Sequence, residues 1–224
     1  EGHELIAHLL GAEQLHRVNE KTTYYLKLAK LRLPATLEQI ECSPARNLTK
    51  QQLATMTEGR YLDHGENLLI TGATGCGKSF LACALGHQAC IQGYKTSYLN
   101  MNRLIEKVIL SRLDGSYIKL LNHLERQSLI ILDDFGLQPM SQELRLTLLQ
   151  LLEDRYGKKS IIITSQLPVA KWHEYINDRN SPALGRHGCN VIHGSCTGIS
   201  VAPGALPDPA GRRRWRRYHR ARGV

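Results

Sequence analysis

Short apolar runs alternate with stretches of helical periodicity through the middle of the chain. Four of these runs are typical of buried strands: Asn67–Thr71, Lys95–Asn100, Leu129–Asp133 and Ser160–Thr164. Strands that are separated from one another by helical segments are characteristic of a parallel sheet with helices on its faces. The pattern therefore predicts an α/β fold for residues 61–178.

Start and stop signals for helices lie between these runs. Lys78–Gln92 carries its apolar residues on one helical face, and Gly93 predicts its end. Ser141 is a suitable N-cap for a second helix, which has a stripe of leucines. Pro168 predicts a short helix that continues through Ile176.

Two flanking regions differ from this pattern. Residues 1–60 have apolar residues at helical spacing with lysines between them, so we expect a helical segment and linker with one buried and one solvated face. An arm that contacts DNA is the less favoured alternative. Residues 179–224 are rich in Gly and Pro, hold no regular period and end in the arginine-rich run 212–222. We expect this atypical tail to be disordered.

Composition limits the class of protein. The chain has 224 residues, of which 42% are hydrophobic and 22% charged, as in ordinary soluble globular proteins. No stretch approaches the roughly 20 apolar residues that cross a bilayer, and no secretory signal is recognisable. The six cysteines form no Cys-x-x-Cys pair and are expected to be free thiols in a reducing cytosol. We therefore expect a cytoplasmic protein with no membrane partner; the start at Glu1 instead of Met suggests a processed or incomplete chain.

The net charge of +9 belongs almost entirely to the tail. Residues 179–224 hold nine Arg, no Lys and one acid, a net charge of +8, whereas residues 1–178 carry a net charge of +1. A strongly basic domain would indicate nucleic-acid binding. Here the charge predicts only a non-specific attraction of the tail to DNA.

The first predicted strand leads into a phosphate-binding motif. Residues 72–79 match G-x-x-x-x-G-K-[ST] between a strand and a helix. Its glycines let backbone N–H groups surround phosphate oxygens at a helix N-terminus. Lys78 is expected to reach the β- and γ-phosphates of ATP, and the Ser79 hydroxyl to bind Mg²⁺. The residues expected to contact the nucleotide are Gly72, Ala73, Thr74, Gly75, Cys76, Gly77, Lys78, Ser79 and Phe80.

Two acids follow the third predicted strand. Asp133 and Asp134 lie at its carboxyl end, where open α/β sheets bind their ligands. We expect Asp133 to hold Mg²⁺, directly or through water, and Asp134 to orient and deprotonate the attacking water. The fourth strand ends in Thr164, Ser165 and Gln166, one of which should face the γ-phosphate if the two strands are neighbours. From the pattern alone, simple termination of the strand explains these polar residues equally well.

Several segments in combination resemble a known family. They are Leu31–Ala35, Gly65–Gly72, Leu81–Gly86, Asp114–Tyr117, Leu132–Gly136, Leu152–Gly157 and Thr164–Pro168. Over about residues 15–178 the chain is similar to the IstB-type transposition helper ATPases of bacterial insertion sequences. These are relatives of the DnaC helicase loader within the AAA+ class.

The resemblance implies a P-loop AAA+ core with strand order 5-1-4-3-2. It also implies ATP-dependent self-association into rings or filaments on duplex DNA, together with a cognate transposase. Carried over by motif, Lys78 and Ser79 are the Walker A residues, and Asp133 and Asp134 are the Walker B pair. Gln166 corresponds to a sensor residue, and so joins Lys78, Asp133 and Asp134 as an expected catalytic residue.

The chain departs from the family pattern after Asp178. The family continues into a helix whose arginine acts at the neighbouring subunit's ATP, and then into a fifth strand; residues 179–224 show neither. Our hypothesis is that this tail is out of frame or foreign. An arginine supplied in trans is worth about 10³–10⁵ in rate. Without this arginine, the chain would bind ATP but hydrolyse it poorly. Arg155 matches a family position near subunit contacts.

The leading interpretation is a AAA+ helper of DNA transposition that binds and hydrolyses ATP with Mg²⁺. A DnaC-like replicative helicase loader is one alternative, and a pull-down with helicase or transposase separates the two. The other alternative is an ATP-binding but hydrolysis-defective DNA-binding or dimerisation module. It predicts nucleotide affinity without turnover at any protein concentration.

Overall fold

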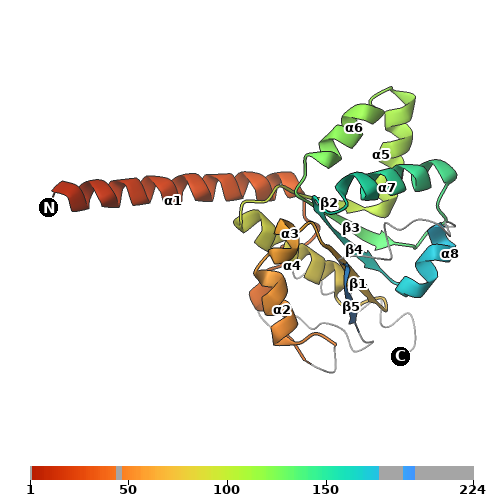
Figure 1. Cartoon of the computed structure of the whole chain (residues 1–224), viewed down its shortest axis with the longest axis horizontal. Coiled ribbons are helices and arrows are strands. Elements are labelled where there is room, and N and C mark those ends of the chain that lie inside the picture. Colours follow the sequence, from red (N-terminus) through yellow and green to blue (C-terminus); the bar gives the residue numbers. More distant parts are fainter. Residues whose placement is uncertain (1, 44–46, 177–188, 195–224) are drawn as a thin grey trace, which may run out of the picture.

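A parallel sheet forms the centre of the molecule (Figure 1). The computed structural model describes residues 2–43, 47–176 and 189–194. Within these ranges the sheet has five strands in the order β2-β3-β4-β1-β5, and every neighbouring pair is parallel. The strands are β1 (Asn67–Gly72), β2 (Thr96–Asn100), β3 (Leu129–Phe135), β4 (Ser160–Ser165) and β5 (Cys189–Gly194). The four strands predicted from apolar runs and the predicted AAA+ strand order are confirmed.

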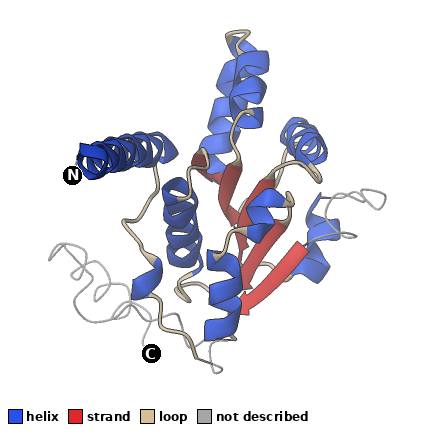
Figure 2. Cartoon of the chain, turned by 60° about the vertical axis from the view of Figure 1, so that its left-hand side comes forward, coloured by secondary structure: helices blue, strands red, loops and turns tan. Residues whose placement is uncertain are grey.

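Helices cover both faces of this sheet (Figure 2). Alternate residues of a strand point to opposite faces, so Leu68 and Ile70 of β1 pack with α4 (Lys78–Ile91), whereas Leu69 packs with the helices of the other face. Those helices are α5 (Met101–Leu113), α6 (Tyr117–Glu125), α7 (Gln142–Arg155) and α8 (Trp172–Ile176). The core is therefore two apolar layers, one on each side of the strands.

The predicted helix signals are confirmed. Ser141 caps α7, since its Oγ accepts a hydrogen bond from the backbone N–H of Leu144 at 3.3 Å. A short 3-10 turn, η3 (Val169–Lys171), leads from Pro168 into α8. No described helix is long and apolar enough to cross a membrane.

The N-terminal region is helical but does not have the expected buried face. α1 (Gly2–Ala29) extends away from the sheet, and Leu5, Leu9 and Leu15 along it are 62–63% exposed. Only its C-terminal part, from about Thr22 onward, is partly buried, and Ala29 at its end is fully buried. The prediction fails because no other described element lies alongside most of the helix. The linker then holds η1 (Leu37–Gln39), α2 (Lys50–Thr57) and α3 (Arg60–Asp63).

β5 lies in the segment where no regular element was predicted. Its six residues pair in register with β1, from Asn67 opposite Cys189 to Gly72 opposite Gly194. An edge strand such as β1 presents unpaired N–H and C=O groups that favour this addition. The expectation of a wholly irregular tail is therefore wrong for residues 189–194. The predicted disorder of the remaining tail falls on residues outside the described ranges.

Candidate functional site

Residues 72–79 form a loop between β1 and the first turn of α4. Gly75 and Gly77 have φ values of +84° and +86°, a conformation that glycine adopts without strain. A Cβ added at Gly75 would meet nothing within 4 Å, so the loop borders open space. The N-terminus of α4 faces the same loop. The partial positive charge of this helix end attracts anions to the loop.

Lys78 lies across this loop. Its ammonium donates hydrogen bonds to the carbonyls of Gly72 at 2.9 Å and of Ala73 at 2.7 Å, and the residue is only 8% exposed. The buried Cys76 thiol is 3.9 Å from the same nitrogen. A cation is thus held at the centre of a glycine-rich turn, where phosphate oxygens would meet it.

Asp133 stands at the end of β3 and is fully buried. Its Oδ1 accepts hydrogen bonds from Ser79 Oγ at 2.8 Å and from Thr164 Oγ1. Its Oδ2 accepts a hydrogen bond from Tyr98 Oη. Burial, followed by the contact with Asp133, raises the pKa of Tyr98, so this tyrosine stays a donor. The two expected metal ligands, Ser79 and Asp133, are therefore in direct contact.

Asp134 is held by its neighbours in a left-handed backbone conformation, with φ +63°. Its Oδ2 accepts a hydrogen bond from Asn100 Nδ2 at 2.9 Å, and its backbone N–H donates to Thr164 Oγ1 at 3.1 Å. Burial and the nearby Asp133 raise the pKa of its carboxyl above the ordinary value. This carboxylate is thus oriented and more basic than a surface aspartate.

Gln166 follows β4 and reaches back to the loop. Its Oε1 accepts a hydrogen bond of 2.7 Å from Thr74 Oγ1. β4 is the neighbour of β3, as the predicted placement required. The side chain of Phe80, in the first turn of α4, packs against the apolar core.

The site fits a nucleotide with a divalent cation. The Ser79 hydroxyl and the Asp133 carboxylate form an oxygen pair of the kind that Mg²⁺ prefers. The open space beside Gly75 leaves room for the phosphates, and the Lys78 ammonium supplies a positive charge for them. Ser79, Asp133 and Lys78 are accordingly the residues that would hold the group.

Sequence reasoning missed several residues of this site. Tyr98 and Asn100 lie on β2, next to β3, so the strand order would have placed them beside the acids. The exposed Arg32, from the linker after α1, places its Nη1 3.6 Å from both Asp133 Oδ2 and Asp134 Oδ2. No local pattern marks this arginine.

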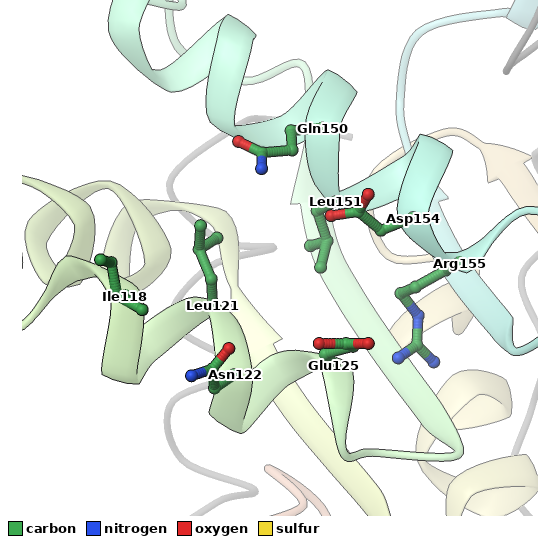
Figure 3. Close-up of a pocket in the computed structure, with 8 residues that line it drawn as sticks. All are labelled: Ile118, Leu121, Asn122, Glu125, Gln150, Leu151, Asp154 and Arg155. Atoms are coloured by element: carbon green, nitrogen blue, oxygen red, sulfur yellow. The ribbon is translucent and has the colours of Figure 1, made fainter.

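Arg155 is buried rather than presented at a surface, being 1% exposed. Its guanidinium donates to the carbonyls of Leu124, Gln127, Ser128 and Ser160 at 2.8–3.1 Å. It also lines a hollow of about 270 Å³ between α6 and α7 (Figure 3). None of the residues that line this hollow belongs to the phosphate loop or the acid pair.

Comparison with known proteins identifies the family. The family model of IstB-like ATP-binding proteins matches residues 2–192. The chain belongs to this family. An insertion sequence ATP-binding protein of Sinorhizobium fredii is 42% identical over 175 residues, which cover 78% of this chain and 71% of that protein. The IS1162 ATP-binding protein of Pseudomonas fluorescens is 40% identical, with 74% and 72% covered.

Solved structures show the same fold. AMPPCP-bound DnaA from Aquifex aeolicus superimposes with a TM-score of 0.62 at 21% identity, over 73% of this chain and 51% of that one. The DnaC helicase loader gives 0.60 at 19% identity, over 74% and 99%. These likenesses establish the P-loop AAA+ fold. The family match includes part of β5, so the expectation that the family pattern stops at Asp178 is wrong for that strand.

Proposed function

We propose that this IstB-like protein binds ATP with Mg²⁺ at the phosphate loop and hydrolyses it while it assists a transposase at target DNA. The observation that carries the proposal is the 2.8 Å contact between Ser79 and Asp133 beside Lys78. It occurs in a chain that is 42% identical to an insertion sequence ATP-binding protein.

Each residue of the site has a role in this proposal. Lys78 turns its ammonium from the loop carbonyls to the β- and γ-phosphates, and Ser79 with Asp133 holds the metal. Mg²⁺ supplies positive charge to the phosphate oxygens when it is bound. Asp134 accepts the proton of the attacking water, and its raised pKa suits this task because a general base works best near the operating pH. Gln166 contacts the transferred phosphate from the end of β4.

The proposed partners are a cognate transposase, duplex DNA and further copies of this chain in a ring or filament. The names of the relatives support the transposase, since they belong to insertion sequences. The structure of the replication initiator DnaA bound to AMPPCP and single-stranded DNA shares the fold alone, at 21% identity. We infer that this chain contacts duplex DNA in an assembly that ATP promotes.

A helicase-loading role is the alternative within the same fold. The match covers 99% of the DnaC loader chain, but only 19% of the residues are identical. Identities of 40–42% with insertion sequence proteins favour transposition. A pull-down in which replicative helicase, and not transposase, is retained would overturn this choice.

ATP hydrolysis measured against protein concentration, with and without duplex DNA, tests the proposal. We expect turnover to rise steeply with concentration and with DNA, and to vanish in Lys78→Ala. Lys107→Ala, which removes an exposed lysine from α5, should behave as wild type. ATP binding without turnover at every concentration would instead identify the hydrolysis-defective module and overturn the proposed hydrolysis.

A further inference from the structure

Arg32 connects the N-terminal helix to the acid pair of the site. It lies three residues after the end of α1, and its Nη1 is 3.6 Å from one carboxylate oxygen of Asp133 and 3.6 Å from one of Asp134. The side chain is 56% exposed, so it reaches the acids from the solvent side. A guanidinium between two carboxylates is a favourable bridge for both.

A nearby cation stabilises the charged carboxylates of Asp133 and Asp134. Asp133 is fully buried, and Asp134 lies beside it at the end of the same strand. A buried carboxylate is costly unless it is paired. The hydrogen bonds from Ser79 and Tyr98 bring no charge, and the Lys78 ammonium donates to loop carbonyls. Lys78 attracts Asp134 from a longer range, whereas Arg32 forms an ion pair with both acids, where a divalent ion would also place positive charge.

The backbone around Arg32 is attached to both α1 and α4. Leu31 packs so closely on α4 that a Cβ at Gly86 would lie 3.1 Å from it. The backbone of Arg32 and Leu33 lies beside the buried thiol of Cys83 on the same helix. Ala29, the last residue of α1, is fully buried nearby, whereas most of α1 is exposed. A movement of Arg32 would thus be passed to the base of α1.

We propose that Arg32 is a clasp that competes with the divalent cation for Asp133 and Asp134, and so couples nucleotide binding to the placement of α1. The proposal rests on the proposed function, since it needs Mg²⁺ and a nucleoside triphosphate at this site. When the metal binds, the guanidinium loses its two carboxylate partners and the linker is released. A partner that binds α1 better once Arg32 is withdrawn is coupled to the metal. By linkage, this partner must strengthen metal binding by the same factor by which the metal strengthens binding of the partner.

A Mg²⁺ titration at fixed AMPPCP, followed by equilibrium nucleotide binding, measures the competition. We expect Arg32→Gln to need about three- to tenfold less Mg²⁺ for half-saturation, the size that two partly exposed ion pairs allow. Arg32→Lys keeps the charge and should stay near wild type. Arg17→Gln is the matched control, because Arg17 forms an exposed ion pair with Glu13 on α1.

Hydrogen–deuterium exchange of residues 26–33 reports the release of the linker. In wild type, Mg²⁺ with AMPPCP should speed exchange there, and Arg32→Gln should show fast exchange without nucleotide. An unchanged Mg²⁺ requirement, or a lowered thermal stability alone, would make Arg32 a structural residue and overturn the clasp. If wild type binds AMPPCP no better than Lys78→Ala does, the proposed function fails as well.

Discussion

Asp134 has an unfavourable backbone and an unfavourable charge at the same position. Its φ of +63° lies in the left-handed region, which is energetically less favourable for Asp than for Gly or Asn. Burial and Asp133 raise its pKa, so the folded chain holds this proton more tightly than the unfolded chain does. The stability gained in this way is present at acidic pH and is lost as the pH rises through the raised pKa.

Asp134→Asn should therefore stabilise the nucleotide-free protein at pH 7 while it abolishes hydrolysis. The amide removes the repulsion from Asp133, keeps an acceptor for Asn100 and tolerates the left-handed backbone. We expect the free energy of unfolding to rise by about 0.5–2 kcal/mol, measured by urea denaturation. The exposed Asp154→Asn is the control. A variant that is less stable than wild type at pH 7 would show that the Arg32 pair outweighs the burial of Asp134.

The sequence was sufficient to predict the placement of residues that a local motif marks. Lys78 and Ser79 are defined by a contiguous motif, and Asp133 and Asp134 by a strand that ends in acids. Arg32 was not predictable, because its contact depends on how the linker crosses α4 and not on its neighbours in the sequence. The same holds for Tyr98 and Asn100, whose positions follow from the pairing of β2 with β3.

At the scale of elements, Arg155 fastens α7 to the start of two strands. Its guanidinium donates to carbonyls at the end of α6, before β3 and at the start of β4. Burial lowers its pKa to about 10, so it remains charged at neutral pH. A buried cation with this many partners is a structural feature, and the family position near subunit contacts is in this chain an internal one.

Arg155→Ala should lower the free energy of unfolding by at least about 3 kcal/mol, because several buried carbonyls lose their donor at once. Urea denaturation would measure this. Arg145→Ala, on the same helix, removes a single 3.5 Å contact with the carbonyl of Ile176 and should cost under about 1 kcal/mol. Similar small losses in both variants would mean that water replaces the guanidinium.

Two elements differ from their sequence-based predictions for opposite reasons. α1 has the apolar residues of a packed helix, but most of its length finds no partner surface among the described residues. β5 has a short and weak pattern, yet the open edge of β1 provides hydrogen-bond partners for it. Periodicity reports what a segment can bury, and the surrounding fold decides whether it does.

On the scale of the whole molecule, the parallel sheet brings the ends of β1, β3 and β4 to one edge. The phosphate loop, the acid pair and Gln166 come from segments separated by up to 92 residues, and hydrogen bonds join them. The strand order could be predicted from the family resemblance, and with it the meeting of these three segments. The proposed function therefore depends most on the binding of Mg²⁺ with ATP at this edge of the sheet.

ATP affinity with and without Mg²⁺, in wild type and in Ser79→Ala, tests this claim most directly. Thr164 still holds Asp133 when the serine hydroxyl is removed, so the fold should persist. We expect Mg²⁺ to raise the ATP affinity of wild type. With a chelator present, Ser79→Ala should bind ATP as tightly as wild type does. The rise in affinity that Mg²⁺ causes should be about tenfold smaller in Ser79→Ala, since one oxygen ligand is missing. An undiminished Mg²⁺ effect in Ser79→Ala would contradict the placement of the metal between Ser79 and Asp133.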